Sequence, residues 1–138
     1  MIIIACIDEK GGMLFNNRRQ SKDRVLIQHI MQMVGNHTLW ITSFSSKLFE
    51  EYIGSNAIVD DDFLSKIQDD DFVFIEDLEW ENIQDKIHKV ILYNWNKKYP
   101  ADKYFELSQD KWQLLSEQDI TGSSHDKITE KVYIRGNI

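Results

Sequence analysis

The segment Ile2-Ile3-Ile4-Ala5-Cys6-Ile7, close to the start of the chain, is apolar throughout and rich in isoleucine. A short, β-branched apolar run is typical of a strand that is buried on both faces of a sheet. Because such a sheet must be covered on both sides, the run predicts a central strand of an α/β domain. Cys6 is the one cysteine of the chain, and its place in this run indicates a buried, unreactive thiol.

The chain that follows alternates between helical and strand patterns. After a turn-prone stretch from Asp8 to Gln20, Ser21 can cap a helix whose apolar residues repeat at i, i+4 and i+7 and which ends at Gly35. Apolar segments predict strands at 38–42, 57–59, 72–75 and 90–93, with short helices at 45–52, 63–67 and 78–86. Beyond Pro100, short strands at 104–105, 112–115 and 131–134 are separated by polar loops.

These patterns predict an α/β fold with a central, mostly parallel sheet flanked by helices and an antiparallel C-terminal edge. We expect one domain over residues 1–138, because this length is typical of a single core. The net charge of −7 argues against nucleic acid as a partner. No apolar run is long enough to span a membrane, and we expect a cytoplasmic protein.

Three stretches together resemble dihydrofolate reductase. Residues 5–17 are similar to that family's first strand and following loop, residues 21–50 to its substrate-side helix, second strand and cofactor-binding turn, and segments between 90 and 135 to its C-terminal strands. The resemblance implies the fold of that family and an NADPH-dependent reduction of dihydrofolate. It also implies a former substrate cleft lined by Ile4, Ala5, Cys6, Leu26, Ile27 and Tyr93.

The sequence departs from the family where the substrate is protonated. The family has a carboxylic acid early in the substrate-side helix, and here that position falls on Leu26 or Ile27, neither of which can relay a proton. Asp23 lies one turn earlier and is the candidate displaced acid. The alternative is that the Asp23 carboxylate complements the dipole in the first turn of the helix.

The cofactor positions depart as well. Where the family has a Gly-Gly pair that admits the pyrophosphate, this chain has Glu76-Asp77, and the turn that offers a glycine and a cation reads Ser43-Phe44-Ser45-Ser46. We expect Asp77 to cap the helix at 78–86, and Glu76 and Glu79 to interact with its positive end. Ser45 or Ser46 is expected to cap the short helix that extends to residue 52. The Arg expected after Glu51 for the folate tail is also missing.

Other chemistry finds less support in the sequence. The four histidines are widely spaced and the aspartate triplets lack the pattern of a calcium loop, so no metal site is expected. No Gly-x-Ser-x-Gly motif or paired histidines indicate a nucleophilic serine.

The leading hypothesis is a degenerate relative of dihydrofolate reductase without hydride transfer and without a cofactor. It would bind a protein partner or a small apolar ligand. The alternative is an active, divergent NADPH-dependent dihydrofolate reductase. A third hypothesis is an α/β interaction protein whose similarity to reductases is fortuitous, and it would show a different strand order.

Overall fold

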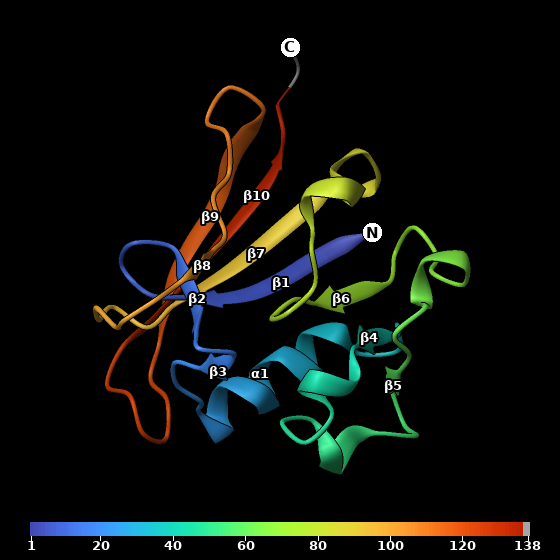
Figure 1. The fold of residues 1–138 in the computed structure, drawn as a ribbon, viewed down its shortest axis with the longest axis horizontal. Helices are drawn as coiled ribbons and strands as arrows, with labels where there is room; N and C mark the ends of the chain where they lie inside the picture. Colours follow the sequence, from blue (N-terminus) through green and yellow to red (C-terminus); the bar gives the residue numbers. More distant parts are fainter. Residues whose placement is uncertain (137–138) are drawn as a thin grey trace.

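The structure is a computed structural model that describes residues 1–136. Its main sheet has seven strands in the order β5-β4-β6-β1-β7-β10-β9 (Figure 1). Strands β5, β4, β6, β1 and β7 are mutually parallel, whereas β10 pairs antiparallel with both β7 and β9. The predicted mostly parallel sheet with an antiparallel C-terminal edge is therefore confirmed. The strands span β1 Ile2–Ile7, β4 Leu39–Ile41, β5 Ala57–Val59, β6 Phe72–Phe74, β7 Lys89–Asn94, β9 Trp112–Ile120 and β10 Ile128–Arg135.

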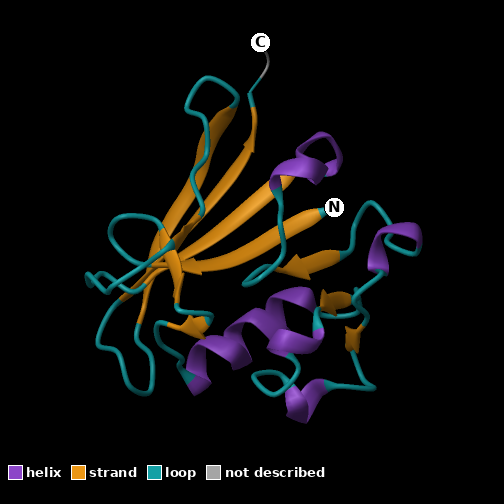
Figure 2. Cartoon of the chain, in the orientation of Figure 1, coloured by secondary structure: helices purple, strands orange, loops and turns teal. Residues whose placement is uncertain are grey.

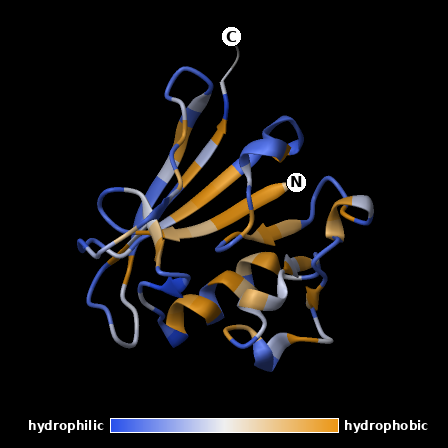
Figure 3. Cartoon of the chain, in the orientation of Figure 1, coloured by the Kyte–Doolittle hydropathy of each residue, from blue (hydrophilic) through white to orange (hydrophobic). Residues whose placement is uncertain are grey.

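Strand β1 lies near the middle of this sheet and is covered on both faces, as its apolar run predicts. Ile2 and Ile4 belong to a core under helix α1, whereas Ile3 and Ala5 belong to a second core on the opposite face. The alternation follows from the two-residue period of a strand. Figure 3 shows the hydrophobic colour on β1, β7 and β6 in the middle of the sheet.

Helix α1, Arg24–Val34, packs one apolar stripe against the sheet. Its buried residues are spaced three and four apart, as one face of an amphipathic helix requires: Leu26, Ile27, Ile30, Met31 and Val34. The helix ends as predicted at Gly35, whose φ of 58° suits a residue without Cβ. The predicted N-cap is wrong, because Asp23 rather than Ser21 accepts the hydrogen bond from the Leu26 N–H.

A second, three-stranded sheet takes two of its strands from the stretch between Asp8 and Gln20 that was expected to contain only turns. It has the order β3-β2-β8, with β2 at Gly12–Phe15, β3 at Arg18–Arg19 and β8 at Lys103–Tyr104. Asn16 and Asn17 connect β2 to β3 with φ values of 51° and 60°. Two consecutive residues with positive φ form the tight hairpin turn that matches the twist of the strands, and asparagine tolerates this conformation.

The other expected helices are shorter than predicted. Within the described residues α1 is the one α-helix, and the remaining helical segments are 3₁₀ turns at Ser43–Ser45, Glu50–Tyr52, Phe63–Ser65 and Glu81–Lys86 (Figure 2). The apolar spacing of Trp80, Ile83 and Ile87 reflects burial of all three against the second core rather than a full α-helix. The last two residues of the predicted 1–138 domain lie outside the described range.

A buried carboxylate ties α1 to the antiparallel part of the sheet. Glu130 on β10 accepts hydrogen bonds from His29 Nε2 at 2.7 Å, from the Tyr93 hydroxyl at 2.8 Å and from Gln118 Nε2 at 2.8 Å. These donors come from α1, β7 and β9, and Glu130 is only 7% exposed. Since a buried charge is tolerated when its hydrogen bonds are satisfied, Glu130 joins the helix to three strands.

Replacement of Glu130 by Gln should lower the free energy of unfolding at neutral pH by about 1–3 kcal/mol, because an amide NH₂ cannot accept these hydrogen bonds. The hydrogen bond from His29 lowers the pKa of Glu130 below its ordinary value of 4.5, against the opposing effect of burial. Because the pKa is lowered in the folded state, the ionised Glu130 stabilises the native protein at pH values above 4.5. This stabilisation is lost as the pH falls through the pKa that Glu130 has in the folded protein. The free energies of unfolding of the native protein and of Glu130→Gln can be measured in urea between pH 7 and pH 3. Their difference should become smaller at pH values below 4.5. A difference that stays constant over this range would contradict the role of Glu130.

Candidate functional site

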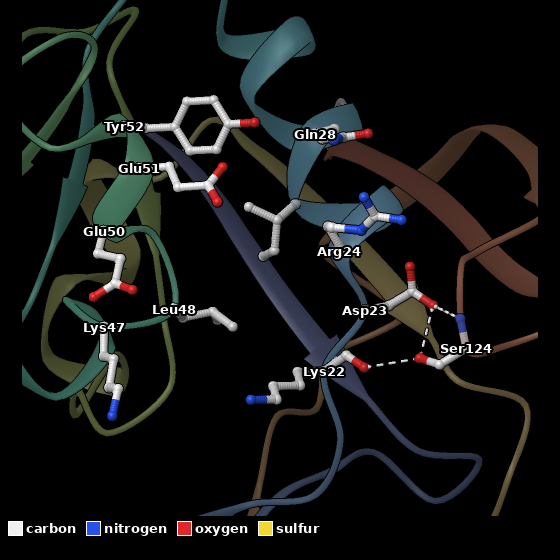
Figure 4. A pocket seen from close by; sticks show the side chains of 11 residues that line it. Lys22, Asp23, Arg24, Gln28, Lys47, Leu48, Glu50, Glu51, Tyr52 and Ser124 are labelled. Atoms are coloured by element: carbon white, nitrogen blue, oxygen red, sulfur yellow. Dashed lines mark hydrogen bonds between the residues drawn. The ribbon is translucent and has the colours of Figure 1, made fainter.

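The carboxyl ends of the parallel strands meet at the edge of the sheet that faces the start of α1. In open α/β sheets this edge is where ligands bind, because loops rather than packed elements surround it. A groove of about 340 Å³ opens here between α1 and the segment 47–52. Figure 4 shows Lys22, Arg24 and Gln28 on the helix side of this groove and Leu48, Glu51 and Tyr52 on the other. Ile27, Leu48 and Tyr52 give it an apolar floor, with charged side chains at its mouth.

The inner part of this cleft is almost filled. A cavity of about 10 Å³, room for roughly one water molecule, lies deeper between α1 and the ends of β1 and β6. Its lining includes Cys6, Leu26 and Ile27, three of the residues predicted to form the former substrate cleft. Burial raises the pKa of Cys6, and the charge of Glu76 adds to this, so the group remains a thiol.

The other three predicted cleft residues lie elsewhere in the core. Ala5 lies on the opposite face of the sheet from α1, because neighbouring strand residues point to opposite faces. Ile4 and Tyr93 are on the helix side but are 0% exposed in the packed core. The Tyr93 hydroxyl is engaged by Glu130.

Glu76 occupies the place where the resemblance implies a Gly-Gly pair, and it is paired with an arginine. Arg19 Nε and Nη2 donate to its two carboxylate oxygens at 2.5 and 2.6 Å, and the Ser45 hydroxyl donates at 2.7 Å. The Arg19 guanidinium also lies 5.7 Å from the centre of the Phe44 ring. Glu76 is 6% exposed, so this bidentate pair, and not a helix N-terminus as expected, compensates its charge.

The remaining predicted cofactor positions are also occupied by internal contacts. The Ser43 N–H and hydroxyl both donate to Asp61, at 2.9 and 3.2 Å. The Ser46 hydroxyl donates to the Ser43 carbonyl at 2.8 Å.

The helix caps expected at these positions are wrong. Ser45 ends a 3₁₀ turn and bonds to Glu76 rather than capping the turn's start. Asp77 is exposed and accepts from the Thr42 hydroxyl at 2.8 Å, whereas the 3₁₀ turn at Glu81–Lys86 begins after Trp80 with no side-chain cap. The Glu79 carboxylate is largely exposed, 3.8 Å from Lys103 Nζ.

Asp23 is the most heavily bonded carboxylate at this edge. Its oxygens accept from the N–H groups of Leu26, Ser123 and Ser124 at 3.1, 3.0 and 2.9 Å. His125 Nδ1 lies 3.0 Å from Oδ2 of the same carboxylate. Asp23 therefore connects the start of α1 to the loop between β9 and β10.

The protonation of Asp23 follows from these contacts. Burial alone would raise its pKa, but the N–H groups of Ser124 and Ser123 and the His125 ring hold the pKa well below its usual range. The group is thus a permanent carboxylate near neutral pH. An acid that donates a proton to substrate needs the opposite shift.

Two polar residues that the sequence analysis did not connect complete this arrangement. His125 is 8% exposed, and its Nε2 lies 2.8 Å from the Ser21 hydroxyl. The Trp95 ring lies against the imidazole, with 4.5 Å between ring centroids. Ser21 and His125 are 104 residues apart, so no local motif signals their contact.

Among residues 1–136, no cluster of three or more His, Cys, Asp or Glu side chains has an arrangement able to hold a metal ion. None of the helices in this range combines the length and the apolar character that a membrane crossing requires.

Gly122 tests how tightly the loop is fitted to Asp23. A Cβ on Gly122 would lie 2.3 Å from Asp23 Oδ2, inside the van der Waals limit. Gly122→Ala should therefore lower the free energy of unfolding by about 1–3 kcal/mol through overpacking. In an Asp23→Ala background the same change should cost much less, because the clashing carboxylate is gone. Equal costs in the two backgrounds, measured by urea unfolding, would show that the loop does not rest on Asp23.

Comparison with known proteins gives a match in structure alone. No protein-family model matches the chain, and no curated protein matches its sequence. Among solved structures, it is similar to a dihydrofolate reductase from Enterococcus faecalis solved in complex with NADP(H) and RAB-propyl. The TM-score is 0.71 at 10% sequence identity, over 99% of this chain and 96% of that one. A different strand order, as a fortuitous similarity would give, is thereby excluded, and the chain has a dihydrofolate-reductase-like fold.

Proposed function

We propose that this protein is a ligand-binding relative of dihydrofolate reductase that has lost hydride transfer. The observation that carries the proposal is the Arg19–Glu76 pair with Ser45, which fills the space beside β1 and β6 with a neutralised, hydrogen-bonded cluster. Because both partners are largely desolvated, opening this cluster would leave a buried charge unpaired. We also keep the cytoplasm as its proposed location.

The residues present do not fit NADPH. A phosphate needs free N–H donors and positive charge, but the Ser43 donors are taken by the Asp61 carboxylate and Arg19 is taken by Glu76. Asp77 adds an exposed negative charge beside Glu76. Each carboxylate about 4 Å from a phosphate would oppose binding by roughly 1 kcal/mol in water and about 4 kcal/mol where water is partly excluded.

In the part of the chain that the structure describes, the cleft also lacks a suitable acid to protonate dihydrofolate. Leu26 and Ile27 border the inner cavity where the acid is expected. Asp23 is held as a carboxylate by hydrogen bonds from three backbone N–H groups, the Ser123 and Ser124 hydroxyls and the His125 ring, and it does not offer a proton. These contacts favour the loss of hydride transfer over an active, divergent reductase.

The open groove supports the binding half of the proposal. It combines the apolar side chains Ile27, Leu48 and Tyr52 with charged side chains of both signs, among them Lys22, Arg24, Glu50 and Glu51. A volume of about 340 Å³ is within the range of small-ligand sites. We therefore favour a small, partly apolar ligand over a protein partner.

Titration with NADPH tests the loss of the cofactor site. We expect no saturable binding below about 1 mM, which corresponds to roughly 4 kcal/mol of binding free energy. Cofactor fluorescence and the shift of the unfolding midpoint provide two independent readouts. A micromolar dissociation constant, competed by NADP, would overturn the proposal in favour of the reductase.

Binding in the groove can be tested with 8-anilino-1-naphthalenesulfonate, a fluorescent probe with an apolar body and one negative charge. We expect saturable binding to the native protein that is weakened about tenfold or more by Leu48→Asp, which puts a charge on the apolar floor. Leu64→Asp is the matched control, since Leu64 is an exposed leucine on the 3₁₀ turn Phe63–Ser65 and does not line the groove. Equal loss in both variants, or none in either, would argue against a ligand site in this groove.

A further inference from the structure

Ser21, His125 and Asp23 form a continuous line of hydrogen bonds at the start of α1. The Ser21 hydroxyl lies 2.8 Å from His125 Nε2, and His125 Nδ1 lies 3.0 Å from Asp23 Oδ2. Asp23 and His125 are 3% and 8% exposed, whereas Ser21 is partly exposed. A buried carboxylate, a buried imidazole and an accessible hydroxyl thus follow one another in this order.

The hydrogen bonds assign the proton positions in this line. A carboxylate only accepts, so His125 Nδ1 carries the hydrogen that points to Asp23. In the neutral ring Nε2 then has a free lone pair, and the Ser21 hydroxyl donates to it. This is the tautomer that a general base needs in order to take a proton from a serine.

We propose that Ser21 is a nucleophile activated by His125 and positioned by Asp23, and that the protein hydrolyses esters of short carboxylic acids. The activity is a different reaction from hydride transfer and uses Asp23 as a fixed carboxylate rather than as a proton donor. It shares the open groove with the proposed ligand binding and does not depend on that proposal. Recognition of such a site depends on geometry and roles rather than on a sequence motif.

The reaction balances with water as the only co-reactant. Ser21 Oγ forms a bond to the acyl carbon while its proton passes to His125 Nε2. The tetrahedral intermediate collapses, the bond to the leaving alcohol breaks, and that alcohol takes the proton from His125. Water then attacks the acyl-serine, His125 accepts the proton of the water and returns it to Ser21, and a carboxylic acid is released.

The surroundings of Ser21 define the class of substrate. Ser21 lines the inner cavity, which has room for about one water-sized group, so the acyl part must be short. Lys22, Asp23, Ile27 and Leu48 line both this cavity and the open groove, which can hold a larger leaving group.

A purely structural role explains less of this arrangement. Asp23 already receives three backbone N–H groups, from Leu26, Ser123 and Ser124, which anchor the loop without His125. The Ser21 hydroxyl meets the ring at Nε2, on the side away from Asp23, and so extends the line of hydrogen bonds beyond that anchor. Trp95 instead packs on the ring of His125 and fixes its orientation, as a positioned base requires.

Hydrolysis of p-nitrophenyl acetate by the full chain tests the proposal. We expect catalysed release of p-nitrophenol that falls about 100-fold in Ser21→Ala, since removal of the nucleophile also removes the proton transfer. The octanoate ester should be hydrolysed much more slowly, because its acyl chain exceeds the inner cavity. Ser65→Ala is the matched control, as Ser65 is an exposed serine on a distant 3₁₀ turn, and its rate should equal that of the native protein.

Covalent labelling gives a readout that does not depend on a variant's folding. A fluorophosphonate reagent should modify the native protein once, and mass spectrometry of the digest should place the adduct on Ser21. An unfolding midpoint within a few degrees of the native value will show that Ser21→Ala is folded. The proposal is overturned if that folded variant hydrolyses the acetate as fast as the native protein, or if the adduct forms on another residue or not at all.

Discussion

The buried Asp23 carboxylate is the interaction on which this edge of the molecule depends. It fixes where α1 begins, and at the same time it holds the loop between β9 and β10 through the N–H groups of Ser123 and Ser124. The close approach requires a glycine at position 122, where any side chain would collide with the carboxylate. A charge in this position is stable because every hydrogen bond comes from a donor that the fold itself places there. Asp23 therefore holds the start of the helix against the C-terminal hairpin, and Glu130 holds its middle through His29.

A second buried charge explains why the inner cleft is filled. Glu76 follows β6 at the carboxyl edge, and a carboxylate there needs a cation. Arg19 supplies it from β3, and β3 exists because the turn at Asn16-Asn17 folds the chain back on β2. The β2–β3 hairpin therefore places Arg19, and Arg19 neutralises Glu76. Ser45 adds a further hydrogen bond to the same carboxylate. Removal of the hairpin turn would leave Glu76 without its partner.

Local patterns predicted the parts of this fold that local physics controls. The apolar run of β1, the periodic face of α1 and its end at Gly35 are all decided within a few residues. The Asn16-Asn17 turn also has a local signal, since consecutive asparagines favour a hairpin turn, but the flanking strands are too short to show clear alternation. The segment 78–86 was misjudged because helical spacing of apolar residues also arises when a 3₁₀ turn is packed against a core.

The contacts that define the site could not be predicted in the same way. Asp23 and Glu76 were recognised as unusual positions, but their partners Ser124 and Arg19 are 101 and 57 residues away in the chain. From the local sequence, Asp77 and Ser45 were expected to cap helices. In the structure Asp77 instead accepts from Thr42, and Ser45 donates to Glu76. The contact between Ser21 and His125 had no local signal, because the two residues meet only when the loop closes on α1. Ser21 was expected to cap the helix instead.

The two buried carboxylates divide the cleft into regions with different chemistry. Around Glu76 all donors and charges are consumed within the protein, so a ligand that enters there must displace an ion pair. Around Asp23 the donors are also consumed, but the line of bonds continues outward through His125 to a hydroxyl beside the cavity. The Ser21 hydroxyl can react with a ligand while the hydrogen bonds of the Asp23 carboxylate stay in place. An open groove is therefore present at this edge of the reductase-like fold. The polar group best placed to react with a ligand in the groove is the Ser21 hydroxyl, just before α1, and not a side chain at the ends of the strands.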